Sequence, residues 1–234
     1  MTGFVSATRL CLPGRLAETD LALDAGQLVC LVGPNGSGKT SLLHALAGIG
    51  RPAGTVAIDG LDRDSVGPGG RSRLVSYLPA TRDINWPLSV RDLVALGSPQ
   101  DDAEAVARIL ADLGLAALAE RRVDRLSTGE RSRALIARAL AAGPKLLLLD
   151  EPVANLDPLW QLRLIAHLRG LAPGKALLVA MHDLDMAGRC ADRLIVMDRG
   201  TIVADGDPAA LLAGPVIPSV FGIERIEGLW RAIA

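Results

Sequence analysis

The chain has 234 residues, of which 50% are hydrophobic and 22% are charged, so it can bury a sizeable core and is not a disordered chain. Its 25 basic and 26 acidic residues leave a net charge of −1, which provides no overall positive field to attract nucleic acid or anionic lipid. The mean hydropathy of +0.32 is high, but the apolar stretches at 28–32 and 176–181 are far shorter than the roughly 20 residues that cross a bilayer.

The N-terminal residues and the cysteines predict a cytosolic protein. The segment MTGFVSATRL has no basic region followed by an apolar run, so no secretory signal is expected. The three cysteines, Cys11, Cys30 and Cys190, are odd in number and lack CxxC spacing. They predict a reducing compartment, with neither a disulfide framework nor a zinc cluster.

A strand, a glycine-rich loop and a helix are predicted in succession in the first part of the chain. The apolar run 27–32 precedes the turn GPNGSGKT at 33–40, and the helical pattern that follows ends at Gly50 and Pro52. One side of this helix is predicted to be apolar, with Leu42, Leu43, Leu46 and Ile49.

The remaining elements alternate between strands and helices. Strands are predicted at 54–60, 74–78, 146–150 and 176–181, a hairpin at 194–205, helices at 90–119, 128–142, 159–170 and 184–191, and a flexible turn at 65–70. The helical pattern is interrupted near Gly97 and Pro99. This alternation predicts an α/β fold with a parallel, doubly wound sheet. The segment 80–142, nearly all helical, is predicted to stand apart as a subdomain.

The turn 33–40 fits the pattern G-x-x-x-x-G-K-[ST], and a match by composition alone has about three chances in a thousand. Gly33 and Gly38 let the backbone curl so that its N–H groups face phosphate oxygens. Lys39 reaches the β- and γ-phosphates, and the Thr40 hydroxyl is a ligand for Mg²⁺. The pattern predicts a nucleotide-binding loop.

Two carboxylates, Asp150 and Glu151, follow the four leucines at 146–149. Open α/β sheets bind their ligands at this end of the strands. There, Asp150 can hold the Mg²⁺ shell and Glu151 can polarise a water for in-line attack on the γ-phosphate. The alternative is an inert, solvated acidic pair, and the phosphate loop upstream favours the catalytic interpretation.

The segment LSTGE at 126–130 has the form S-x-x-E, which predicts a capping box at the start of a helix. The same helix terminus can accept a second phosphate group from outside the chain. The segment LSTGE, which precedes Asp150 in the chain, resembles the LSGGQ signature of ATP-binding cassette (ABC) ATPases. The other motifs of that family follow in order: Walker A at 33–40, Walker B at 146–150, the catalytic glutamate Glu151, the D-loop Ala154-Asn155-Leu156-Asp157, and the switch histidine His182.

This resemblance implies a P-loop NTPase core with a mostly parallel sheet over 1–79 and 143–234, an N-terminal antiparallel β part, and a helical subdomain at 80–142 that carries the signature. It implies a head-to-tail pair of identical subunits with two ATP molecules between them. By position, it assigns ATP contacts to Gly33, Pro34, Asn35, Gly36, Ser37, Gly38, Lys39, Thr40, Ser41, Ser127, Gly129 and Asp157, Mg²⁺ to Thr40 and Asp150, and catalytic roles to Glu151, His182 and Lys39.

A chain that carries a single cassette is similar to the ATPase subunit of an importer. The implied partners are membrane permease subunits and a substrate-binding protein, without nucleic acid, at the inner face of the cell membrane. The segments LSVRDLVALG and PSVFGI resemble ATPases of iron-siderophore, haem and cobalamin uptake. An apolar cluster for the permease is expected at Trp86, Pro87, Leu88 and Val90, unless these residues only pack the helical subdomain.

The chain departs from the family at two positions. The family's glutamine after Leu-Pro is replaced by Ala80, which has no side-chain donor or acceptor, although Asp83 or Asn85 can shift in and Gln100 is remote. No Phe, Tyr or Trp lies between Phe4 and Tyr77 to stack on adenine, which leaves the guanidinium of Arg15 as a substitute. We expect hydrolysis to survive, slower or more weakly coupled.

Three alternatives remain open from the sequence. The first is a degenerate cassette that binds ATP with little turnover, and the second is a regulatory ATPase without a transporter. The third, a small-molecule kinase, is disfavoured by LSTGE and Glu151. Whether the C-terminal segment 222–234 docks on this chain or on a partner is also open.

Overall fold

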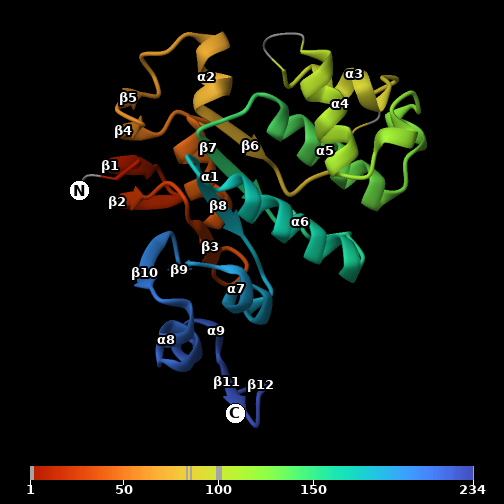
Figure 1. Cartoon of the computed structure of the whole chain (residues 1–234). Coiled ribbons are helices and arrows are strands. Elements are labelled where there is room, and N and C mark those ends of the chain that lie inside the picture. The colour runs from red at the N-terminus through yellow and green to blue at the C-terminus, as the bar shows by residue number, and fades with distance from the viewer. Residues whose placement is uncertain (1–2, 83, 85, 99–101, 234) are drawn as a thin grey trace.

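The computed structural model describes residues 3–82, 84, 86–98 and 102–233 (Figure 1). Asp83, Asn85, Pro99 and Gln100, which are named above, lie outside these described residues. The strands are β1 (Val5–Leu12), β2 (Leu16–Leu23), β3 (Leu28–Val32), β4 (Ala53–Ile58), β5 (Leu61–Asp62), β6 (Val75–Leu78), β7 (Leu146–Asp150), β8 (Ala176–Ala180), β9 (Arg193–Asp198), β10 (Thr201–Gly206), β11 (Ile223–Ile226) and β12 (Leu229–Ala232).

The α-helices are α1 (Lys39–Ala47), α2 (Pro68–Leu74), α3 (Val90–Ala95), α4 (Ala103–Asp112), α5 (Thr128–Ala141), α6 (Pro158–Leu171), α7 (Leu184–Cys190), α8 (Pro208–Ala213) and α9 (Val216–Phe221). Two 3₁₀ turns lie at Ala116–Leu118 and Val123–Arg125. Across the described residues, every helix is too short or too polar to span a bilayer.

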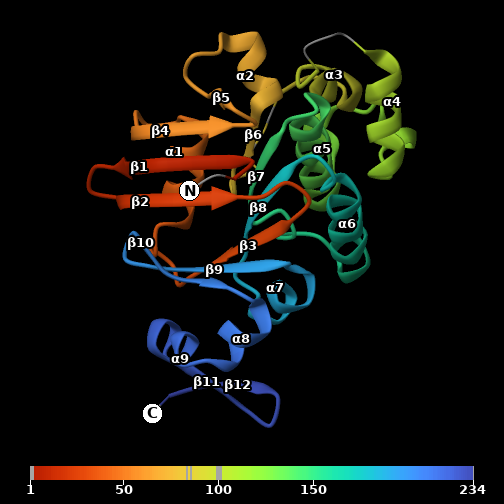
Figure 2. The ribbon, with the colours of Figure 1, turned by 60° about the vertical axis from the view of Figure 1, so that its left-hand side comes forward.

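The central sheet has the order β10-β9-β3-β8-β7-β6, and all its neighbours are parallel except β10 and β9. A second, antiparallel sheet has the order β2-β1-β4-β5 and contains the N-terminal strands. Figure 2 shows this sheet beside the central one, while α3, α4 and α5 lie together at the other side of the molecule. The predicted fold, an α/β core with an antiparallel β part and a group of helices, is confirmed.

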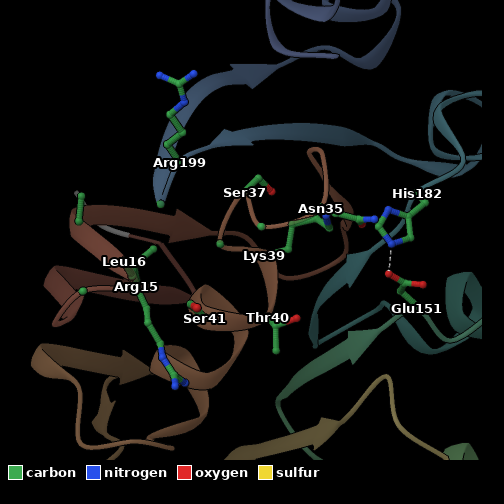
Figure 3. Close-up of a pocket in the computed structure, with 15 residues that line it drawn as sticks. Arg15, Leu16, Asn35, Ser37, Lys39, Thr40, Ser41, Glu151, His182 and Arg199 are labelled. Atoms are coloured by element: carbon green, nitrogen blue, oxygen red, sulfur yellow. Dashed lines mark ion pairs between the residues drawn. The ribbon is translucent and has the colours of Figure 1, made fainter. Parts of the chain in front are cut away.

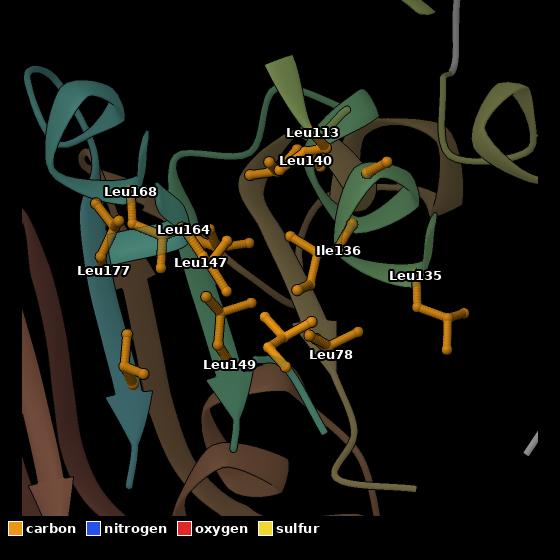
Figure 4. Close-up of a cluster of buried hydrophobic side chains, with 14 of the residues drawn as sticks. Leu78, Leu113, Leu135, Ile136, Leu140, Leu147, Leu149, Leu164, Leu168 and Leu177 are labelled. Atoms are coloured by element: carbon orange, nitrogen blue, oxygen red, sulfur yellow. The ribbon is translucent and has the colours of Figure 1, made fainter. Parts of the chain in front are cut away.

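The middle strands β3 and β8 are apolar throughout, and β7 is apolar up to Asp150, because both faces of the sheet are covered there. Along β7, Leu147 and Leu149 enter one core cluster, which includes residues of α5 and α6. The alternate Leu146 and Leu148 enter a second cluster, which includes α1 and the antiparallel sheet. Figure 4 shows the first cluster between β7, α5 and α6. Buried strands of this kind hold β7 and its terminal carboxylate rigidly in place.

The structure corrects three expectations about local elements. Residues 65–70 are not only a turn, because α2 begins at Pro68, where the fixed φ of proline suits the first turn of a helix. Ile49 is 42% exposed, since α1 ends at Ala47 and Gly48 adopts a left-handed conformation with φ 78°. In segment 80–142, expected to be nearly all helical, the described residues 80–82, 84 and 86–88 lie outside any helix, and α3 begins only after its cap, Ser89.

The C-terminal segment docks on this chain. It forms the hairpin β11–β12, in which Glu227 and Gly228 have positive φ values of 49° and 82°, as a tight two-residue turn requires. Arg225 forms an ion pair of 3.1 Å with Asp185 on α7, and Trp230 packs against the first core cluster.

Candidate functional site

The loop 33–38 leaves no room for side chains at two of its glycines. A Cβ on Gly33 would lie 2.4 Å from the carbonyl oxygen of Met197 and 2.4 Å from Ser37 Oγ. Gly38 has φ 102°, and its Cβ would lie 3.0 Å from Cα of Gly200. The loop is therefore closed against the turn between β9 and β10, and α1 starts directly after it with free N–H groups at its N-terminus.

A cavity of about 770 Å³ lies over this loop and the start of α1 (Figure 3). Its lining consists of Gly14, Arg15, Leu16, Ala17, Asn35, Gly36, Ser37, Gly38, Lys39, Thr40, Ser41, Glu151, His182, Arg199 and Gly200. The turn between β1 and β2 and the turn between β9 and β10 close one side of it. The hairpin at 199–200 was predicted, but its place beside the phosphate loop was not, because only the parallel pairing of β3 with β9 brings the two together.

Lys39 lies almost fully buried at the loop, with 7% exposure. Its Nζ donates hydrogen bonds to the carbonyl oxygens of Gly33, at 2.7 Å, and Pro34, at 3.1 Å. Burial lowers the pKa of Lys39, while the carboxylates of Glu151 and Asp150 raise it. The ammonium thus bonds to the loop's own backbone, and it is poorly solvated, which favours its binding to an anion.

Thr40 and Asp150 place two oxygen atoms side by side at the end of β7. The Thr40 hydroxyl donates to Oδ2 of Asp150 over 2.7 Å, and Asp150 is only 1% exposed. A hydroxyl and a carboxylate are hard oxygen ligands of the kind that Mg²⁺ prefers. The residues present therefore fit a magnesium ion.

Glu151 and His182 meet across neighbouring strands. They follow β7 and β8, which are parallel, so their side chains emerge at the same edge of the sheet. Nε2 of His182 contacts Oε1 of Glu151, as the dashed line in Figure 3 marks. The side chains are 47% and 26% exposed, so water reaches the pair. A carboxylate with access to water, held by an imidazole, has the geometry of a general base.

Arg82 is a site residue that sequence reasoning missed. It is 6% exposed, and its Nη2 donates to the carbonyl oxygens of Asp150, at 3.0 Å, and Glu151, at 3.1 Å. Burial lowers its pKa, against the raising effect of Asp150. Nearby, Nε2 of His44 and the hydroxyl of Tyr77 lie 3.0 Å apart. The only sequence signal was an arginine two positions after the unexpected Ala80.

Ser127, Gly129 and Asp157 do not line the cavity. The Ser127 Oγ accepts from the N–H of Glu130 over 3.3 Å, and the Glu130 carboxylate accepts from the N–H of Ser127 over 2.8 Å, which confirms the predicted capping box of α5. Asp157 caps α6 through the N–H of Trp160. Ser127 and Asp157 are exposed, so both are accessible to another molecule.

Arg15 lies on the cavity wall in the turn between β1 and β2, and it is exposed. Among the residues that line the cavity, none is Phe, Tyr or Trp. The planar guanidinium of Arg15 therefore remains the candidate surface for stacking on a base.

Comparisons with known proteins agree with this geometry. The family model described as ABC transporter matches residues 16–154. The chain is 39% identical to a haemin import ATP-binding protein, HmuV, from Rhodopseudomonas palustris, over 93% of this chain and 87% of the relative. It is 37% identical to a cobalamin import ATP-binding protein, BtuD, from Halobacterium salinarum, over 88% of this chain and 54% of that relative.

Solved structures give the same result. An ATP-binding subunit of an ABC transporter superposes with a TM-score of 0.79 at 25% identity, covering 93% of both chains. The cbiO1 protein of Clostridium perfringens, part of the transporter complex cbiONQ, superposes with a TM-score of 0.77 at 25% identity, over 94% of this chain and 95% of that one.

Proposed function

Since this chain belongs to the ABC transporter family and is an ATP-binding, ATP-hydrolysing subunit, we propose that two copies pair head to tail and hydrolyse Mg²⁺-ATP between them. The observation that carries the proposal is the separation of the two phosphate-binding features. Lys39 and its loop line the cavity, whereas Ser127 and Gly129 lie outside it. One chain therefore supplies half a site, and the exposed helix terminus of a second copy completes it.

Within this site, the residues of the chain have different roles. When ATP binds, the Lys39 ammonium donates hydrogen bonds to phosphate oxygens in place of the carbonyls of Gly33 and Pro34. The hydrogen bonds to phosphate are stronger because both partners are charged. Thr40 and Asp150 would hold Mg²⁺, which neutralises charge on the phosphates and helps to orient them.

Glu151 and His182 act on the attacking water and the γ-phosphate. Glu151 accepts the proton of the water, and His182, released from its contact with Glu151, donates to the γ-phosphate. The presence of both groups, in contact and open to water, supports turnover rather than ATP binding alone.

A shared site makes a specific prediction for mixed variants. Lys39→Ala and Ser127→Arg are each expected to be inactive. In a homodimer of either variant, both ATP sites contain the substituted residue. Mixing them places an intact loop opposite an intact signature in one site of each mixed pair, and the rate should recover to about a quarter of the wild-type value at most. The wild-type rate should also rise faster than linearly with protein concentration. Failure to recover on mixing, with a linear rate, would show that a single chain is the active unit.

For the transported compound, we propose the metal-chelate class that includes iron-siderophores, haem and cobalamin. Two relatives carry names of haemin and cobalamin import, and the segments at 88–97 and 218–223 resemble that group. A substrate-binding protein and a permease would complete the importer at the inner face of the membrane. The ATPase rate of the assembled transporter should rise with a binding protein loaded with one of these compounds and stay constant with a sugar-loaded one.

The permease is proposed to dock in a groove of about 520 Å³ between β6 and the helices α3 and α5. Trp86 and Leu96, which are 45% and 61% exposed, line it, and Arg138 lies 5.7 Å from the centre of the Trp86 ring. Val90, by contrast, is fully buried and belongs to the core. Exposed apolar side chains around a hollow suit a helix or loop of a membrane partner.

Leu96→Asp is therefore expected to prevent co-purification with the permease and to leave ATP binding by the isolated chain unchanged, because a charge in the groove must be desolvated on docking. The matched control is Leu61→Asp, on β5 of the antiparallel sheet, where the leucine is 49% exposed. Equal retention of the permease by both variants would exclude this groove as the docking site.

A further inference from the structure

The loop after β6 reaches the ATP site through an unexpected side chain. At position 80, where the family carries a glutamine, Ala80 is exposed and offers only its backbone. Two residues later, Arg82 turns inward and is 6% exposed. Its guanidinium contacts the end of β7, where Asp150 and Glu151 lie.

The contacts of Arg82 fall on both sides of the proposed base. Nη2 donates to the carbonyl of Asp150, before Glu151, and to the carbonyl of Glu151 itself. Glu151 has a left-handed backbone with φ 52°, which is unfavourable for a glutamate and persists only where its surroundings enforce it. The N–H of Glu151 is held by the carbonyl of Ala180, at 3.1 Å. The Glu151 carbonyl also accepts from the N–H of Ala154, at 3.2 Å, and Arg82 supplies the side-chain bonds to both carbonyls, so it helps to set the direction of the Glu151 side chain.

A second buried arginine shows how Arg82 differs from a structural one. Arg63 is 2% exposed and likewise donates to two successive carbonyls, those of Ala45 and Leu46 at the end of α1. Its other two nitrogens are bound by the carboxylate of Asp64. In Arg82, by contrast, Nε and Nη1 are buried without a partner among the described residues. A buried cation with unused donors is costly for stability, and such costs are characteristic of functional positions.

We propose that Arg82 is a positioning residue for hydrolysis, which orients Glu151 through the carbonyls on both sides of its Cα. The inference rests on the proposed function, because it gives Arg82 a role in the hydrolysis for which Glu151 is the proposed base.

The test compares Arg82→Ala, Arg82→Lys and Arg63→Ala in the full chain. Steady-state hydrolysis gives kcat and KM, the fluorescent analogue trinitrophenyl-ATP reports nucleotide binding, and thermal melting reports stability. Arg82→Ala is expected to lower kcat by about tenfold or more, with nucleotide affinity within about threefold, because only the orientation of the base is lost. Arg82→Lys, which keeps the charge and a donor, should recover part of kcat. Arg63→Ala should lower the melting temperature and retain kcat.

The outcomes separate this proposal from the proposed function. If the wild-type chain does not hydrolyse ATP, the function itself fails. If it does and Arg82→Ala keeps kcat within about twofold, Arg82 has no positioning role. Equal losses of kcat in Arg82→Ala and Arg63→Ala would likewise overturn the proposal, because the effect would then be a general loss of structure. Should Arg82→Ala not fold, Arg82→Lys decides: unchanged kcat and KM in that variant would contradict a role for the Nη2 contacts, because a lysine side chain ends one bond short of the position of Nη2.

Discussion

Lys39→Ala is expected to abolish ATP hydrolysis and to weaken ATP binding by about a hundredfold or more, since a charge-assisted contact with the phosphates is lost. The side chain is 7% exposed and its ammonium bonds to the carbonyls of Gly33 and Pro34, so it lies at the phosphate loop. Its partial desolvation, which lowers its pKa, makes an anionic partner more valuable than it would be at the surface. Titration with trinitrophenyl-ATP and a steady-state assay measure the two effects.

The chain offers a matched control for this substitution, because only three of its residues are lysine. Lys145→Ala removes a lysine whose side chain is 40% exposed and pairs with Asp59. Surface ion pairs contribute little to stability, about 1 kcal/mol or less, so this variant should bind and hydrolyse ATP like the wild type. Retained ATP affinity in Lys39→Ala would mean that the cavity over the loop is not the nucleotide site.

Glu151→Gln is the second substitution with a large expected effect. It should lower kcat by about a thousandfold, since the amide cannot accept the proton of the attacking water, while ATP still binds. Because closed pairs then fail to separate, ATP should convert the variant to a dimer that size-exclusion chromatography detects. His182 keeps a polar partner in the amide, so the fold around the site is expected to persist.

Glu120→Gln provides the comparison for this experiment. Glu120 is 76% exposed and pairs with Arg91 over 2.7 Å. Both residues are distant in sequence from Asp150, which ends β7. It should hydrolyse ATP at the wild-type rate and remain monomeric after turnover. If Glu151→Gln behaves in the same way, Glu151 is not the base, and another group of the site must accept the proton.

The motifs predicted from local sequence correspond to the parts of the site that short-range geometry dictates. The spacing of Gly33, Gly38 and Lys39 suffices for the loop, because a closed backbone and a helix start depend on neighbouring residues only. The capping box at Ser127 is equally local, since Glu130 lies one turn away.

Other features are not encoded by periodicity: two helix boundaries follow from the single residues Gly48 and Pro68, and the remaining features from contacts between distant segments. Ile49 has the right spacing for an apolar helix face, yet α1 ends before it, and α2 begins where only a turn was expected. Among Trp86, Pro87, Leu88 and Val90, the pattern did not distinguish surface from core, and packing against the helices buries Val90 alone completely. The last residues form a hairpin on this chain, where Trp230 packs against the first core cluster and Arg225 pairs with Asp185, far away in the sequence.

The sequence by itself determined the family and the order of the motifs, and it predicted Lys39, Asp150, Glu151 and His182 as the groups with chemistry, because residue types at fixed spacing carry that information. Only the tertiary structure decided that Arg82 is buried against the carbonyls of Asp150 and Glu151, whereas Ala80 faces outward. The physical reason is that β6 and β7 are neighbours in space but lie far apart in the chain. Which loop residue reaches the end of β7 follows from the course of that loop across the sheet, which no local pattern specifies.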